Sequence, residues 1–335
     1  MKTGILIINL GTPDSPSTAD VRKYLREFLS DPRVIDLKPA ARWSLVNFII
    51  SPIRAPKSAK LYQQIWNENG SPLLYYSVRQ KELLQQRLGS EYVVEMGMRY
   101  QSPSIEDALK KFNSPAFTKI KVIPLFPQYA SASTGSVQEK VMNIISKWEV
   151  IPHVEFISYL YNQESFIKAF AEIGKKYDPL GYDHILMSFH GLPERQIRKS
   201  DCFDYCLKEN CCASIGEKNA FCYRAQCYET ARRLATQLQL PFEKYTVCFQ
   251  SRLSATGGWI QPFTDHILKE RAEKGDKKLL IFAPAFVSDC LETIYEIGVE
   301  YDVLFKKLGG EKVQLVESLN DHPLWIDALE KISLN

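Results

Sequence analysis

The chain has 335 residues, of which 45% are hydrophobic and 24% charged, a composition typical of soluble globular proteins with about two domains. Its net charge of +3 is too small to indicate a nucleic-acid partner. Residues 4–10 already read as a strand, and the sequence has neither the ordered parts of a signal peptide nor an apolar run of the roughly 18 residues that span a bilayer. We therefore expect a cytoplasmic protein.

Apolar strands alternate with amphipathic helices along the first half of the chain. Residues 11–16 form a loop rich in breakers, and Ser17 and Asp20 are suited to begin the next helix. Helical patterns follow at residues 59–66, 78–88 and 104–112, and strand patterns at residues 92–98 and 119–126. This alternation is typical of a parallel sheet with helices on both faces.

Residues 37–56, called the lip below, interrupt this alternation with an apolar segment. Arg42, Asn47 and Pro52 divide it, and it is too short to cross a membrane. Two interpretations remain open for its apolar side chains. They are ordinary core, or they form an exposed surface that touches a membrane or an apolar ligand.

The second half of the chain repeats the order of elements of the first. Residues 5–13 parallel residues 185–193, residues 92–98 parallel 245–249, and residues 119–127 parallel 278–286. We therefore predict two similar α/β halves at residues 1–160 and 161–318, with a last helix within residues 319–335 that packs back on the first half. Halves of this kind face each other across a cleft, which is a common place for a ligand.

A histidine ends the strand at residues 185–190. His190 is followed at once by a glycine and proline turn, and residues just past the carboxyl end of a parallel strand line the ligand crevice. A neutral imidazole there can accept a proton near pH 7 or bind a metal. Taken alone, His190 could equally be a turn residue that caps backbone groups.

Three carboxylates follow the strand at residues 278–286. Asp289, Glu292 and Glu296 are spaced i, i+3, i+7, which predicts that they share one face of a helix. Solvent-exposed faces often carry such charges. Because these carboxylates begin at the same edge of the sheet as His190, we interpret them as a path that brings metal cations in or carries protons out.

Trp259 lies beside two glycines at a loop–helix junction. It is either ordinary packing or an aromatic face for a flat ligand. The sequence contains neither a P-loop nor a dinucleotide-binding glycine motif, which argues against nucleotide chemistry.

Six of the eight cysteines lie between Cys202 and Cys227, in an insert at residues 200–227. Disulfides are not expected in a cytoplasmic protein, so this clustering favours a metal site over packing. Thiolates prefer soft or borderline metals, and the spacing alone does not exclude zinc.

In their order along nearly the whole chain, the motifs resemble those of the ferrochelatases, which insert ferrous iron into a porphyrin. The motifs are residues 10–13, 70–72, 99–100, 127–129, 134–136, 188–193, 250–252, 259, 286–301 and 317–320. The resemblance implies two Rossmann-like domains, each a parallel sheet flanked by helices, with the porphyrin in the cleft between them.

The resemblance also implies roles for single residues. His190 matches the family's active-site histidine and Glu292 the carboxylate that faces it, so both are candidate catalytic residues and metal ligands. Asp289 and Glu296 match an acidic metal path. Positions around the macrocycle are matched by Leu10, Arg99, Tyr100, Gln250, Ser251, Trp259 and Phe286. Cys290 departs from the histidine that is frequent there, and a thiol is a poorer proton acceptor at neutral pH.

The cofactor follows from the resemblance as well. Some microbial ferrochelatases hold a 2Fe–2S cluster in a short internal cysteine insert, which favours a cluster over zinc and leaves free thiols third. Cys227 matches a cysteine of members without the insert. The candidate ligands are therefore Cys202, Cys206, Cys222 and one of the adjacent pair Cys211 and Cys212.

The implied reaction is the insertion of ferrous iron into protoporphyrin IX to make protohaem, the last step of haem biosynthesis. The lip matches an apolar lip that takes up lipophilic porphyrin, and would give peripheral contact with the inner face of the membrane. A chelatase for coproporphyrin or another tetrapyrrole is one alternative, although a more anionic ring would favour additional basic residues. A non-enzymatic haem carrier with His190 as axial ligand is another, and it leaves Asp289, Glu292 and Glu296 without a purpose.

Overall fold

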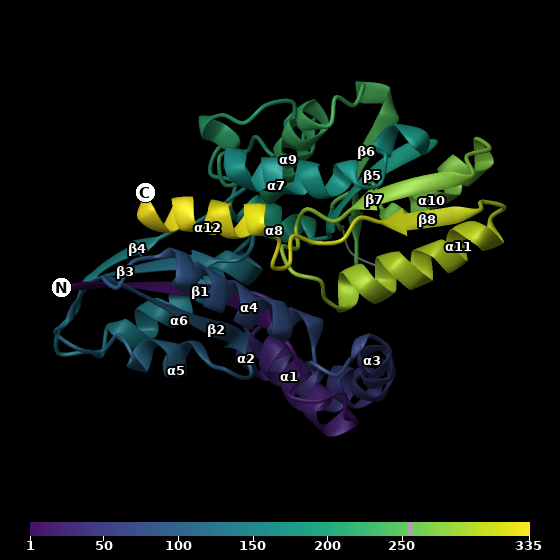
Figure 1. Cartoon of the computed structure of the whole chain (residues 1–335). Coiled ribbons are helices and arrows are strands. Elements are labelled where there is room, and N and C mark those ends of the chain that lie inside the picture. Colours follow the sequence, from purple (N-terminus) through teal and green to yellow (C-terminus); the bar gives the residue numbers. More distant parts are fainter. Residues whose placement is uncertain (253–257) are drawn as a thin grey trace. The chain divides into compact units, whose positions relative to one another are not determined.

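The computed structural model describes residues 1–252 and 258–335. They form two compact units, the first comprising Met1–Phe126, Ser131–Ser158 and Ile326–Asn335, the second Pro127–Ala130 and Tyr159–Trp325. Each unit is built on a four-stranded parallel sheet flanked by helices (Figure 1). The predicted fold class, two similar Rossmann-like domains, is confirmed.

The first unit has the strand order β2-β1-β3-β4. Its strands are β1 (Lys2–Gly11), β2 (Tyr92–Tyr100), β3 (Phe117–Pro124) and β4 (His153–Phe156). Its helical elements are α1 (Thr18–Ser30), α2 (Pro39–Ser44), η1 (Leu45–Ile50), α3 (Ser51–Ile65), α4 (Pro72–Arg87), α5 (Ile105–Lys110), η2 (Ser131–Gly135), α6 (Ser136–Ile145) and most of α12 (Pro323–Leu334).

Local sequence explains where these elements begin. The Ser17 hydroxyl accepts the Asp20 N–H and caps α1, which confirms the predicted helix start. Pro72 at the first turn starts α4 earlier than the predicted residue 78, since proline is favoured at that position. Apolar side chains of α5 and α6 cover one face of the sheet, where they pack on Leu6, Ile8, Ile120 and Val122.

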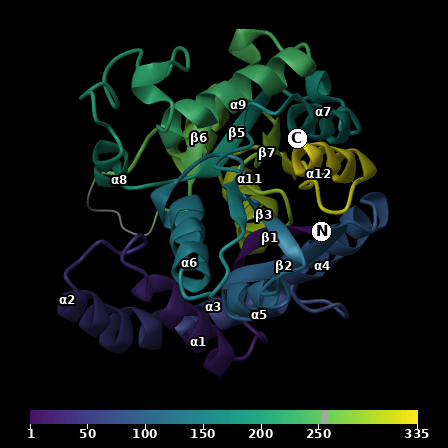
Figure 2. The ribbon, with the colours of Figure 1, turned by 90° about the vertical axis from the view of Figure 1, so that its left-hand side faces the viewer.

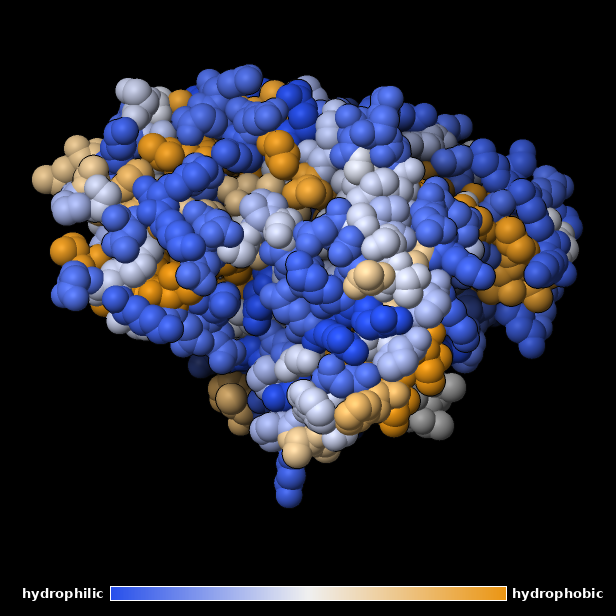
Figure 3. Space-filling model, turned by 90° about the horizontal axis from the view of Figure 1, so that it is seen from below, coloured by the Kyte–Doolittle hydropathy of each residue, from blue (hydrophilic) through white to orange (hydrophobic). Residues whose placement is uncertain are grey.

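The lip is helical, because α2, the π-helical η1 and α3 follow one another without a break. Val46 is fully buried against Leu29 and Ile35, whereas other apolar side chains of the lip are exposed, among them Trp43, Phe48, Ile49 and Ile53. Val46 is therefore part of the core, whereas contact of the exposed side chains with a membrane or an apolar ligand stays a prediction. On the side where α1 and α3 lie, Figure 3 shows hydrophobic residues in patches between hydrophilic ones. Among the described residues, no helix combines the length and apolarity that crossing a membrane requires.

The second unit has the strand order β6-β5-β7-β8. Its strands are β5 (His184–His190), β6 (Tyr245–Gln250), β7 (Lys278–Phe282) and β8 (Lys312–Leu315). Its helical elements are α7 (Glu164–Lys175), η3 (Pro179–Gly181), α8 (Glu194–Lys199), η4 (Glu217–Asn219), α9 (Tyr223–Gln237), η5 (Phe242–Lys244), α10 (Thr264–Glu273), η6 (Glu292–Tyr301) and α11 (Asp302–Lys307).

The helices of the second unit cover its sheet on both faces. Helices α7 and α9 lie side by side (Figure 2), whereas α10, η6 and α11 pack on Leu186, Leu279 and Ile281. The strands are nearly continuous apolar runs, as expected when both faces of a parallel sheet are buried. The polar residues at their carboxyl ends are therefore where chemistry can occur.

The three-carboxylate helix face was predicted wrongly. Asp289 lies before the helix, and Glu292 and Glu296 lie on η6, which is a π-helix rather than an α-helix. A π-helix has more residues per turn than an α-helix, so the spacing i, i+3, i+7, which fits one face of an α-helix, does not define one face here. Such turns are frequent at functional sites.

Candidate active site

His190 is the last residue of β5, at the carboxyl edge of the second sheet. Its Nδ1 atom lies 2.7 Å from the Gly191 carbonyl oxygen. A carbonyl can only accept, so Nδ1 carries the hydrogen and the neutral ring holds its lone pair on Nε2. His190 is thus set up to accept a proton or to bind a metal through Nε2.

The loop after His190 is held on several sides. The Gly191 N–H donates to the Gln250 carbonyl at 2.7 Å, and a Cβ at Gly191 would lie 2.8 Å from that oxygen. Only glycine fits so close an approach. Pro193 and Trp259 form an antiparallel bridge that ties the loop to the chain before α10. The imidazole is therefore mounted on a rigid turn.

Ser251 follows the neighbouring strand β6 and faces η6. Its backbone N–H donates to the Glu296 carboxylate at 2.9 Å, and its hydroxyl donates to the other carboxylate oxygen. Ser251 adopts a φ of 62°, in the left-handed region that costs energy for a residue with a side chain. This conformation lets both donors of one residue reach one carboxylate.

The pKa of the Glu296 carboxyl is raised above its usual value. Burial raises its pKa, the negative charge of Glu292 adds to the rise, and the hydrogen bonds from Ser251 and Tyr301 and the charge of His190 oppose it. Glu296 therefore lies within electrostatic reach of both His190 and Glu292. The structure brings these three predicted residues together at one edge of the sheet.

The carboxylate of Asp289 is held by hydrogen bonds on both of its oxygens. Its oxygens accept hydrogen bonds from the Asn320 amide at 2.7 Å, the Thr293 hydroxyl at 3.0 Å and the Ser318 N–H at 3.2 Å. The side chain is buried, and these donors occupy both of its oxygens. In this structure Asp289 fastens the start of η6 to the loop after β8.

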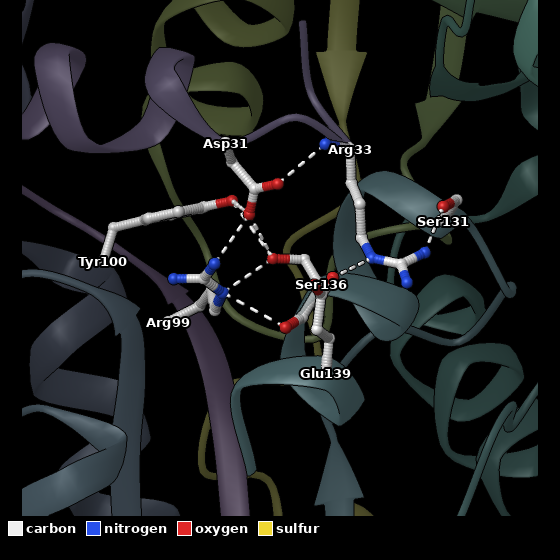
Figure 4. Close-up of polar contacts among 7 residues, drawn as sticks. All are labelled: Asp31, Arg33, Arg99, Tyr100, Ser131, Ser136 and Glu139. Carbon is white, nitrogen blue, oxygen red and sulfur yellow. Dashed lines mark hydrogen bonds and ion pairs between the residues drawn. The ribbon is translucent and has the colours of Figure 1, made fainter. Parts of the chain in front are cut away.

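In the first unit, a carboxylate holds the two predicted residues at the end of β2 (Figure 4). Asp31, the C-cap of α1, accepts from Arg99 Nη2 at 2.6 Å and from the Tyr100 hydroxyl at 2.9 Å. The Ser136 hydroxyl donates to the same oxygen at 2.5 Å, and the Arg33 N–H donates to the other at 2.7 Å. Arg99 and Tyr100 are thereby locked in place.

The remaining predicted porphyrin contacts differ in exposure. Leu10 near the end of β1 and Phe286 after β7 are half-buried, and the Phe286 ring lies edge-on to His190 with centroids 6.4 Å apart. Tyr100, Gln250 and Trp259 have exposed fractions of only 0%, 2% and 7%. We infer that these three orient the residues around them in the conformation described.

Thiols of the insert gather around Cys222, which precedes helix α9. A hydrogen bond from Cys212 lowers the pKa of Cys222 to about 6, and although burial opposes this, N–H groups at the start of α9 add to it. Cys206 interacts with the same sulfur, and the Sγ atoms of Cys211 and Cys212 lie 3.7 Å apart. Cys202, in contrast, is exposed.

Positive charge lies close to these sulfurs. Arg224 Nη1 donates to the sulfur of Cys212 at 3.4 Å and to that of Cys211 at 3.9 Å. Within residues 1–252 and 258–335, however, no three His, Cys, Asp or Glu side chains are arranged to hold a metal ion. The cysteines thus lie close to one another and to a positive charge, but in the described residues they are not in metal-coordinating geometry.

Sequence reasoning missed Asp31 and Tyr223. The sequence contains one weak indication for Asp31. A carboxylate at a helix C-terminus is disfavoured by the helix dipole, which suggests that a positively charged or hydrogen-bonding group elsewhere in the chain compensates it. Tyr223, whose hydroxyl donates to the His190 carbonyl at 2.8 Å, had no such indication, since it lies 33 positions away in the chain.

A model of the ferrochelatase family matches residues 2–335 of the chain. The chain belongs to the ferrochelatase family. A ferrochelatase from Legionella pneumophila strain Lens is 47% identical to this chain, and the match covers 99% of this chain and 98% of the relative. A ferrochelatase from Coxiella burnetii strain CbuK_Q154 is 45% identical, and the match covers 99% of this chain and 93% of the relative. The fold is similar to that of the sirohydrochlorin chelatase SirB from Bacillus subtilis subspecies spizizenii, whose crystal structure is in complex with cobalt. The TM-score is 0.50 at 14% sequence identity, and the match covers 98% of this chain and 92% of that chain.

Membership of the ferrochelatase family makes the chain an enzyme of porphyrin metallation. This confirms the resemblance stated from the motifs and sets aside the non-enzymatic haem carrier.

Proposed function

We propose that this ferrochelatase inserts ferrous iron into protoporphyrin IX to give protohaem, with His190 and Glu292 as its catalytic residues. The observation that carries the assignment is the Nδ1–H bond from His190 to Gly191, which leaves Nε2 as a proton acceptor. Glu292 and Glu296 bond to Gln250 and Ser251 at the end of the neighbouring strand, the same edge of the sheet as His190. Metallation must remove two N–H protons from the porphyrin as the metal enters. Groups that accept protons and groups that bind a dication are both needed at one place.

We propose a path for the protons that runs from His190 to the carboxylates of η6. His190 accepts a pyrrole proton at Nε2, and Glu292 assists in transferring metal or proton. Because burial raises the pKa of Glu296, this carboxylate takes up a proton more readily than an exposed glutamate, which suits it to pass protons outward. Asp289, whose oxygens are occupied by three donors, supports the position of η6.

Contacts to the macrocycle are proposed for Leu10, Arg99, Ser251 and Phe286, which retain some exposure. For the buried Tyr100, Gln250 and Trp259 we propose a supporting role instead of direct contact with the ring. Bending the ring between apolar and aromatic walls exposes the pyrrole nitrogens to the metal, and binding energy supplies that strain.

An anaerobic metallation assay with ferrous iron tests the function. We expect conversion of protoporphyrin to haem, followed by absorption, and slower conversion of coproporphyrin under the same conditions. No metal insertion into either ring would refute the chelatase assignment. Faster reaction with coproporphyrin would instead support the alternative substrate.

We also propose that the insert holds a 2Fe–2S cluster through Cys206, Cys222, Cys202 and one of Cys211 and Cys212. The donors are of the kind that such a cluster takes, because thiolates bind soft metals, and the sulfurs of Cys206 and Cys212 both interact with that of Cys222. The contact between Cys212 and Cys222 favours Cys212 over its neighbour. A bound cluster would cross-link the insert, and since metallation transfers no net electrons, its role is structural or sensory.

Visible absorption of anaerobically purified protein tests the cluster. We expect a brown protein whose colour is lost in Cys212→Ser and kept in Cys211→Ser, a matched pair of adjacent thiols. A colourless protein that contains stoichiometric zinc would contradict the proposal, and equal loss of colour in both variants would contradict the choice of Cys212.

Finally, we propose that the lip contacts an anionic membrane surface at the inner face of the membrane. Residues 37–65 carry Lys38, Arg42, Arg54, Lys57 and Lys60 and no acidic residue, beside the exposed apolar side chains. Apolar area and positive charge on the same surface favour binding to anionic lipid.

Co-sedimentation with phospholipid vesicles tests this contact. We expect binding to vesicles that contain anionic lipid, reduced about tenfold or more in Phe48→Ser, since burying a large apolar side chain is worth about 1.5–3 kcal/mol. Phe242→Ser is the matched control, because Phe242 is also highly exposed but lies in the other unit. Equal loss in both variants, or no binding at all, would contradict a specific role for the lip.

A further inference from the structure

The carbonyl of His190 is held by a side chain outside its own strand and loop. The Tyr223 hydroxyl donates to this carbonyl oxygen at 2.8 Å. Tyr223 is the first residue of helix α9, and its ring is buried. A buried tyrosine hydroxyl requires a hydrogen-bond partner, and a carbonyl at the end of a strand requires a donor, so each satisfies the other.

The same residue stands next to the thiols of the insert. Cys222 is the N-cap of α9, directly before Tyr223, and its sulfur interacts with those of Cys206 and Cys212. The thiol of Cys227, one turn along α9, interacts with the Tyr223 hydroxyl. A change in the position of the Cys222 backbone therefore moves the start of α9, and with it the tyrosine that holds His190.

We propose that Tyr223 is a positioning residue for His190 and that it connects the cysteine insert to the active site. The hydroxyl of Tyr223 fixes the His190 carbonyl, and through the turn at Gly191 this fixes the direction of the imidazole. A metal or cluster held in part by Cys222 would fix the residue that precedes α9, and through Tyr223 it would fix the position of the His190 carbonyl. The connection to the insert rests on the proposed cluster, whereas the positioning role does not.

Geometry indicates why the hydroxyl matters for rate rather than for binding. The peptide between His190 and Gly191 is held at both ends, because its carbonyl accepts from Tyr223 and its N–H donates to Gln250. The next carbonyl, that of Gly191, accepts the His190 Nδ1–H and so orients the ring. A small displacement of a catalytic group can lower a rate about 100-fold while the binding of the rest of the substrate is kept.

Replacing Tyr223 with phenylalanine removes only the hydroxyl. We expect Tyr223→Phe to lower kcat for metallation about tenfold and to leave KM for the porphyrin within about twofold. Tyr228→Phe is the matched control, because Tyr228 lies on the same helix and its hydroxyl accepts a hydrogen bond from Arg224 instead. This control should change neither constant, and a Tyr223→Phe enzyme with the kcat of the unmodified protein would overturn the positioning role.

A spectroscopic measurement keeps this test independent of activity. The chain has five histidines, so labelling with ¹⁵N-histidine gives few ring signals, and His190→Ala assigns those of His190. We expect Tyr223→Phe to shift the Nδ1 and Nε2 signals of His190 and to leave the other four histidines unchanged. If the metallation assay failed altogether, this spectrum would still decide whether Tyr223 holds His190, and unchanged signals would overturn the proposal.

Combining variants tests the connection to the insert. Cys222→Ser should lower kcat and shift the His190 signals in the unmodified background, but should add little to Tyr223→Phe, because both interrupt the same path. Effects that multiply independently would overturn the connection. If the purified protein held no metal, the cluster and the connection would both be refuted, and the comparison of Tyr223→Phe with Tyr228→Phe would still test the positioning role.

Discussion

Replacing His190 with alanine is expected to lower kcat for iron insertion by about 1,000-fold or more, while the porphyrin still binds with nearly unchanged affinity. General acid–base groups contribute about 100- to 10,000-fold to a rate, and His190 is in addition a candidate metal ligand. Its removal leaves no imidazole at the end of β5. Stopped-flow metallation and porphyrin fluorescence titration measure the two quantities separately.

A second substitution at His190 separates proton acceptance by Nε2 from the structural hydrogen bond made by Nδ1. Asparagine keeps an N–H group that can donate to the Gly191 carbonyl, as His190 Nδ1 does, but it has no basic nitrogen in place of Nε2. His190→Asn should therefore be as inactive as His190→Ala. His266→Ala is the control, because His266 is exposed on α10. Turnover close to that of the unmodified enzyme in His190→Asn would refute proton transfer through Nε2.

The location of His190 could be predicted because strand ends in a parallel sheet meet at one edge. His190 ends β5 and Gln250 ends β6, and the structure pairs them in register. The apolar run before each residue was sufficient to predict this, since buried parallel strands are nearly continuous apolar segments. Ser251, the residue after Gln250, lies at this edge as well, and it bonds to Glu296 there.

The geometry of the acidic residues could not be predicted in this way. The spacing of Asp289, Glu292 and Glu296 fits an α-helix, but the chain forms a π-helix from Glu292 onward, and Asp289 bonds to Asn320 instead. Apolar periodicity does not predict a π-helix, and the bond of Glu296 to Ser251 joins residues 45 positions apart, so the sequence gives no signal for it either.

The roles of Asp31 and Tyr223 could not be predicted either, because their partners lie far away in the sequence. The bonds of Asp31 to Arg99, Tyr100 and Ser136 join residues 68, 69 and 105 positions apart. A single sequence contains no signal for such pairs, since each residue alone fits an ordinary surface or core position. The roles of these residues depend on which elements the fold brings together.

Asp31→Ala is expected to lower the free energy of unfolding of the first unit by about 3–5 kcal/mol. Asp31 is buried, and three donors converge on its Oδ2 atom, including the charged Arg99 guanidinium (Figure 4). Removing one partner of a buried ion pair leaves the other charge and its donors without compensation, which costs about that much. Urea unfolding followed by tryptophan fluorescence and by circular dichroism measures the change.

Glu139→Gln is the matched control, because Glu139 pairs with Arg33 in the same cluster but both side chains are substantially exposed. Exposed pairs contribute about 0–1 kcal/mol, so this variant should unfold almost as the unmodified protein does. Equal losses in the two variants would contradict a special role for Asp31. A large loss confined to Asp31→Ala would mean that the buried carboxylate, where the charge of Arg99 and two hydroxyl donors meet, stabilises the first unit far more than the exposed pair of the same cluster.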